Sequence, residues 1–147
     1  MMSNEPALVD TNVLVYSLFK DAPQHEASRE LVHKAGSKDI SLFVAAQTMA
    51  EFYSIVTNPR RVTNPRSCLE AIGAIESFLS MPGLTLVQQP VDLVRRWCEL
   101  LRQRPVTGGD VFDLQLVATM MASGISRIFT FNSDDFIPFP LIQVLVP

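Results

Sequence analysis

Short apolar runs alternate along the chain with longer segments in which apolar side chains recur every three or four residues. Ala7-Leu8-Val9 is one such run, and it stops abruptly at the polar Asp10, as a buried strand does at its end. Met49, Phe52 and Val56 are spaced to share one face of an amphipathic helix. These two patterns predict strands at 7–9, 41–44, 84–87, 128–131 and 142–146, and helices at 13–19, 25–35, 45–57, 67–79, 92–101 and 112–123.

The alternation of strands with helices predicts an α/β fold of three layers, α/β/α, in which helices cover both faces of a mainly parallel sheet. Ligands of such folds bind at the carboxyl ends of the strands. Asp10 ends the first strand, and Asn132 follows the strand after the last long helix. Both side chains are therefore expected at the edge where chemistry occurs.

Composition places the chain among compact globular proteins, because 48% of its 147 residues are hydrophobic and 18% are charged. This length predicts a single domain over residues 1–147. Cys68 and Cys98 lack the spacing of a zinc motif and are expected to be reduced thiols. The sequence has no apolar run typical of a leader or a membrane span, so we expect a cytoplasmic protein without a membrane partner.

The net charge of −3 does not favour nucleic-acid binding, which usually depends on an excess of Lys and Arg. The arginines are nevertheless clustered, and such clusters either hold phosphates or form solvated surfaces. Charge alone favours solvated surfaces. The two clusters are Arg60, Arg61 and Arg66, and Arg95, Arg96, Arg102 and Arg104.

Asp113 lies on the apolar stripe of its predicted helix, four residues before Val117, so its carboxylate points inward. A buried carboxylate needs a cation or a metal as its partner. No Arg or Lys lies at the strand ends that Asp113 would face, whereas Asp10 and Glu51 are placed to approach it. Several acids without basic partners suggest a divalent cation, and oxygen ligands would select Mg²⁺ or Mn²⁺. On spacing alone, satisfied carboxylates remain the commoner explanation.

The order and spacing of these acids resemble the PIN-domain family, and more narrowly the VapC-type toxins of bacterial toxin-antitoxin pairs. The resemblance covers essentially the whole chain. Its most specific parts are Asp10-Thr11-Asn12 near the beginning and Thr130-Phe131-Asn132-Ser133-Asp134-Asp135-Phe136 near the end, with Glu51 and Gly109-Asp110-Val111-Phe112-Asp113 between them.

The resemblance implies a set of acidic metal ligands, which are Asp10, Glu51 and Asp113. It also implies that Thr11 and Asn12 shape the site beside Asp10. The chain departs from many family members at Asn132, where they have an acid, and this puts a second metal in doubt. An amide there can still orient a water.

The family cuts RNA in single-stranded or loop regions by metal-dependent phosphodiester hydrolysis, so the resemblance implies an endoribonuclease with Mg²⁺ or Mn²⁺ as its cofactor. Arg60, Arg61 and Arg66 are then candidates to hold the RNA backbone. The resemblance further implies a homodimer and a small antitoxin protein as a partner.

Several alternatives stay open at this point. Asp110 is either the N-cap of the following helix, as its place after two glycines favours, or a further ligand. A PIN nuclease of RNA processing without an antitoxin, and an RNA-binding module with a weakened site, both fit the sequence. A phosphate-accepting domain would also use an Asp at a strand end. This sequence lacks the lysine that such a domain has at a later strand end, which argues against that alternative.

Overall fold

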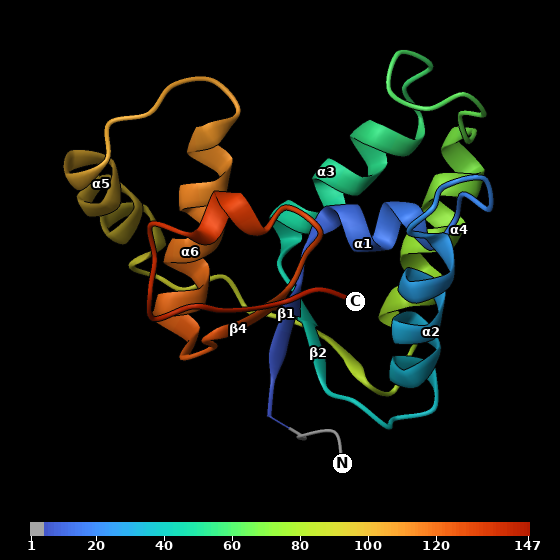
Figure 1. The fold of residues 1–147 in the computed structure, drawn as a ribbon, viewed down its shortest axis with the longest axis horizontal. Coiled ribbons are helices and arrows are strands. Elements are labelled where there is room, and N and C mark those ends of the chain that lie inside the picture. The colour runs from blue at the N-terminus through green and yellow to red at the C-terminus, as the bar shows by residue number, and fades with distance from the viewer. Residues whose placement is uncertain (1–4) are drawn as a thin grey trace.

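The computed structural model describes residues 5–147 and confirms the alternation of strands and helices (Figure 1). The strands are β1 (Ala7–Val9), β2 (Leu42–Val44), β3 (Leu84–Leu86), β4 (Arg127–Phe129) and β5 (Gln143–Leu145). The helices are α1 (Thr11–Tyr16), α2 (His25–Gly36), α3 (Ala46–Val56), α4 (Cys68–Leu79), α5 (Leu93–Gln103), α6 (Asp110–Ser123) and the short 3₁₀ helix η1 (Ser133–Phe136).

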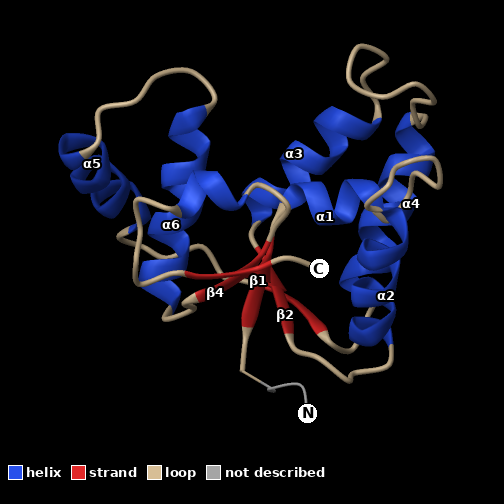
Figure 2. Ribbon diagram, in the orientation of Figure 1, coloured by secondary structure: helices blue, strands red, loops and turns tan. Residues whose placement is uncertain are grey.

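The five strands form one sheet in the order β3-β2-β1-β4-β5, and all neighbouring strands are parallel. From β1 the chain builds outward to β2 and β3 on one side, and later returns to add β4 and β5 on the other. The strands lie between two groups of helices, with α5 and α6 on one side (Figure 2). The three-layer α/β/α prediction is therefore confirmed.

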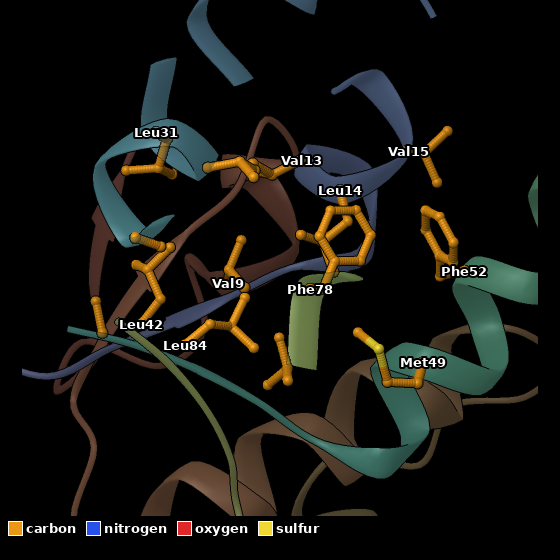
Figure 3. Close-up of a cluster of buried hydrophobic side chains, with 14 of the residues drawn as sticks. Val9, Val13, Leu14, Val15, Leu31, Leu42, Met49, Phe52, Phe78 and Leu84 are labelled. Carbon is orange, nitrogen blue, oxygen red and sulfur yellow. The ribbon is translucent and has the colours of Figure 1, made fainter. Parts of the chain in front are cut away.

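Two hydrophobic clusters hold the layers together, one on each face of the sheet. The first joins the sheet to α1, α2, α3 and α4, and Figure 3 shows its side chains converging between these elements. Within it, the rings of Phe52 and Phe78 meet edge to face, with their centroids 5.4 Å apart. The second cluster joins the sheet to α5 and α6 through residues such as Leu100 and Val117.

Helix boundaries differ from the predicted ones where a capping residue decides them. Asp10 accepts a hydrogen bond from the backbone N–H of Thr11, so α1 begins earlier than expected. The preference for Asp110 as a cap is wrong, because the N-cap of α6 is Gly109. The backbone at Gly109 already has helical angles, so Asp110 falls inside the first turn and makes no capping bond. Gly124 ends α6 in the left-handed conformation, as expected.

Within residues 5–147, no helix combines the length and the hydropathy needed to cross a membrane.

Candidate active site

The candidate site lies between the carboxyl ends of β1 and β4. At this point the order in which strands are added to the sheet reverses, because β2 and β3 lie on one side of β1 and β4 and β5 lie on the other. Asp10 directly follows β1, and Thr130 directly follows β4. The two strands are neighbours, and the backbone N–H of Asp10 donates to the carbonyl of Phe129 over 2.9 Å. This is the switch point at which ligands bind in open parallel sheets.

Three groups donate hydrogen bonds to the carboxylate of Asp10. They are the backbone N–H of Thr11 (2.8 Å), the hydroxyl of Thr130 (2.8 Å) and the side-chain amide of Asn12 (3.3 Å). Burial nevertheless raises the pKa of Asp10, and it outweighs the hydrogen bonds that favour the charged form. The carboxylate is thus held in one orientation, in surroundings that resist its charge.

Thr130 joins the elements around Asp10. Its buried hydroxyl donates to Asp10 and accepts hydrogen bonds from the side-chain amide of Asn12 (3.2 Å) and the backbone N–H of Asn132 (3.0 Å). The carbonyl oxygen of the Asn12 side chain accepts from the N–H of Phe131 over 3.1 Å. The hydroxyl therefore uses its one donor and both acceptor positions.

Glu51 reaches the same site from α3. One of its oxygens accepts a hydrogen bond from the hydroxyl of Thr11 (3.1 Å), and the other accepts from the side-chain amide of Gln47 (2.9 Å). Thr11 follows Asp10 in the chain, so the first contact links the two carboxylates through adjacent residues. Glu51 is half-buried and is held at both oxygens.

Asp113 lies half-buried in the first turn of α6, and none of the ion pairs among residues 5–147 includes it. Burial raises the pKa of Asp113 to about 7, and nearby negative charges add to the effect. These charges are, in decreasing order of effect, those of Asp135, Asp10, Asp110 and Glu51. An excess of negative charge is therefore concentrated around Asp113.

Asp110 and Asp135 belong to this electrostatic cluster although both are exposed. Burial raises the pKa of Asp135, and the charges of Asp110 and Asp134 add to the effect. Asp110 thus influences the site through its charge. Its role as a ligand stays a prediction.

A cleft of about 800 Å³ opens at the site. Its lining includes most of the side chains that the sequence singled out, namely Asp10, Thr11, Asn12, Glu51, Asp113 and Asn132. Asp110 is not among the lining residues. The cleft continues from the carboxylates past Tyr16 and Phe19 to the loop between α3 and α4. One continuous cleft therefore connects the acidic cluster with the loop that carries Arg60, Arg61 and Arg66.

These three arginines have different surroundings. Arg61 is exposed and lines the cleft, whereas the exposed Arg60 does not. Arg66 also lines the cleft, but its guanidinium donates to the carbonyls of Leu18 (3.0 Å) and Asn64 (2.9 Å). It also lies 4.5 Å from the centroid of the Phe19 ring. Of the three, Arg61 is therefore best placed to meet a ligand in the cleft.

The donor set fits Mg²⁺ or Mn²⁺, because carboxylate oxygens are the ligands that these hard cations prefer. Within residues 5–147, no three His, Cys, Asp or Glu side chains are close enough to enclose a metal by themselves. Mg²⁺ does not need such an enclosure, since it keeps several waters and often binds one or two carboxylates together with substrate phosphate. The uncompensated charge at Asp113 fits a cation of this kind.

Sequence reasoning missed two residues of the site, Thr130 and Gln47. Thr130 was part of a predicted strand and of the segment that carries the family resemblance, but no role in the site was assigned to it, although its place two residues before Asn132 at a strand end was an available signal. Gln47 precedes Glu51 by four residues on a helix, a spacing that brings two side chains together.

Comparisons with known proteins point to one family. The sequence model of the PIN domain matches residues 7–138. Ribonuclease VapC24 of Mycobacterium tuberculosis is 28% identical over 140 residues, which cover 95% of this chain and 94% of the relative. Ribonuclease VapC43 of the same species is 29% identical over 110 residues, or 75% of each chain.

Solved structures share the fold. The structure of VapC20 from Mycobacterium tuberculosis, described as a Sarcin-Ricin loop cleaving toxin, matches with a TM-score of 0.66 and 19% identity, covering 90% of this chain and 95% of that one. VapBC2 from Rickettsia felis, bound to a DNA fragment from their promoter, matches with a TM-score of 0.65 and 19% identity, covering 96% and 98%.

Proposed function

The chain belongs to the PIN domain family, and we propose that it is an endoribonuclease that hydrolyses RNA with Mg²⁺ or Mn²⁺, for which Asp10, Glu51 and Asp113 supply ligands together with water and substrate phosphate. The observation that carries the proposal is the shared cleft. All three carboxylates line it, and Asp113 has no basic partner in the described ion pairs. The ribonuclease names of the relatives support RNA as the substrate.

The residues of the site would have different roles in binding the cation. Asp10 is held by Thr130 and the N–H of Thr11, so it presents a fixed carboxylate. Asp113, with a pKa of about 7, would hold the cation as a carboxylate and would have to lose its proton to do so. When bound, the cation supplies Lewis-acid chemistry and a more acidic water for attack on the phosphodiester. No protein nucleophile is required.

We further propose that the protein is the toxin of a toxin-antitoxin pair. VapBC structures from Rickettsia felis and Haemophilus influenzae share its fold, as does a structure described as a toxin-antitoxin complex from Klebsiella pneumoniae. The partner would be a small antitoxin protein, and the homodimer stays a prediction. A neighbouring reading frame for a small DNA-binding protein would favour the toxin over a PIN nuclease of RNA processing.

The first experiment is cleavage of a mixed RNA pool, transfer RNAs included, by purified protein free of antitoxin. Mg²⁺ or Mn²⁺ should give discrete cuts, and EDTA or Asp113→Asn should abolish them. Mn²⁺ should also raise the unfolding temperature of the wild type and not of Asp113→Asn, because a ligand stabilises only the state that binds it. Identical behaviour of folded wild type and Asp113→Asn would instead favour a non-catalytic RNA-binding module.

A further inference from the structure

One side chain connects the two helices that carry Glu51 and Asp113. The amide nitrogen of Gln47 on α3 donates to an oxygen of Glu51 over 2.9 Å and to the backbone carbonyl of Phe112 over 2.8 Å. A side-chain amide has two N–H groups, so it can serve both acceptors at once. Phe112 directly precedes Asp113, and the amide therefore links one carboxylate to the backbone beside the other.

The orientation of this amide is fixed by its partners. A flipped amide would place its oxygen against two acceptors, the Glu51 carboxylate and the Phe112 carbonyl. In the observed orientation the amide oxygen of Gln47 is buried, and no donor in the described part of the chain reaches it. A buried carbonyl oxygen without a donor is unfavourable. The amide nitrogen of Gln47 thus keeps its two hydrogen bonds, although the amide oxygen is left without one.

The main apolar contacts of these two helices belong to different core clusters. Met49 and Phe52 of α3 lie in the first core cluster, whereas Val117 and Met120 of α6 lie in the second. On its other side, α6 is held by α5, because the indole of Trp97 donates to the carbonyl of Val111 over 2.9 Å. The first turn of α6 is therefore fixed by side chains from both neighbouring helices.

We infer that Gln47 is a positioning residue that sets Glu51 and Asp113 at the spacing needed to share one divalent cation. This role rests on the proposed function. Gln47 acts through Glu51 and the Phe112 carbonyl and touches neither the cation nor the RNA. Groups that orient metal ligands typically change metal affinity or activity by about 10- to 100-fold when they are removed.

The test compares Gln47→Met, which keeps a long unbranched side chain without the donor, with the full-length wild type. We expect the dissociation constant for Mn²⁺, measured by calorimetry without RNA, to rise by about 10-fold or more. In cleavage assays, kcat at limiting Mn²⁺ should fall while KM for RNA changes less than about twofold, and added Mn²⁺ should restore kcat. Gln115→Met, which alters a half-buried glutamine on α6 outside the cleft lining, is the matched control and should leave Mn²⁺ binding unchanged.

A purely structural role predicts a different result. If Gln47→Met lowers the unfolding temperature but binds Mn²⁺ as the wild type does, the positioning role is wrong. Gln47→Asn, whose amide is one methylene too short to reach both acceptors, should show the same loss of affinity, and it carries the test if the Met variant does not fold. If the wild type cuts no RNA yet binds Mn²⁺ more tightly than both variants, the nuclease proposal fails and the positioning role stands.

Discussion

At the scale of single residues, Asp113 carries a charge that its surroundings oppose. Its pKa is about 7 in the folded chain, against a usual value of 3.8. Between pH 4 and 7 the folded chain therefore holds a proton that the unfolded chain has lost. Without metal, the free energy of unfolding should fall as pH rises through this window and level off above it.

Asp113→Asn removes that charge. We expect the metal-free variant to be more stable than the wild type by about 1 to 2 kcal/mol at pH 8, because solvent screens part of the half-buried side chain and reduces the full effect of the pKa shift. The difference should shrink as pH falls from 7 toward 4. Urea unfolding in EDTA at pH 5 and pH 8 measures it. Glu76→Gln, at an exposed site on α4, should show no such difference, and a destabilised Asp113→Asn at pH 8 would contradict the argument.

A second prediction at this scale concerns Thr130, because its buried hydroxyl forms hydrogen bonds with three residues. Thr130→Val keeps the shape and removes these bonds, so we expect a loss of about 1 to 3 kcal/mol of stability and much weaker cleavage. Thr130→Ser retains the hydroxyl and should keep most of the activity. Denaturant unfolding and cleavage rates test both variants, and a Thr130→Val protein as stable and active as the wild type would contradict the role of the hydroxyl.

Residue type and spacing drew attention to Asp10 at a strand end and to Asp113 on an inward helix face, but it was the resemblance to the PIN-domain family that made Asp10, Glu51 and Asp113 a set of metal ligands. Thr130 and Gln47 carry no such mark. Each is an ordinary polar residue whose importance depends on partners that only the folded chain brings near it. The same reason explains why Arg60, Arg61 and Arg66 looked alike in the sequence although their surroundings differ.

At the scale of elements, hydrophobic periodicity placed every strand and long helix but not their ends. Periodicity reports which face is buried, whereas a helix begins where a cap and the backbone angles allow. Asp10 starts α1 earlier than the apolar pattern suggested, and the helical angles of Gly109 start α6 before Phe112. These two shifts affect the site directly, because both helix ends lie beside its carboxylates.

Arg66 has a role at this scale, since it ties the loop between α3 and α4 to the carbonyl that follows α1. Arg66→Lys cannot reach the carbonyls of Leu18 and Asn64 together, so we expect about 1 to 2 kcal/mol lower stability and a looser loop. Limited trypsin digestion after Arg60 and Arg61 measures the loosening. Arg29→Lys, in an exposed pair on α2, should leave digestion unchanged. Equal digestion of both variants would argue against the tie.

At the scale of the whole molecule, the alternation of elements predicted the three layers but not the order of the strands. That order depends on pairings between distant segments, and it places β4 beside β1 so that Thr130 meets Asp10. The distribution of charge in the fold also explains how a chain of net charge −3 can offer a site for RNA. Charge is separated along one cleft, with acids at the sheet edge and Arg61 in the loop between α3 and α4.

This separation predicts different effects for two adjacent arginines. Arg61→Gln should weaken binding of single-stranded RNA and reduce the slope of log affinity against log salt by about 0.7, the value for one phosphate contact. Arg60→Gln removes the same charge outside the cleft lining and should change neither. Both substitutions are made in Asp113→Asn protein with EDTA, so that binding is measured without cleavage. Equal losses for the two would mean that the loop attracts RNA through its overall charge. A loss confined to Arg61 would mean that Arg61 itself holds a phosphate of the RNA in the cleft.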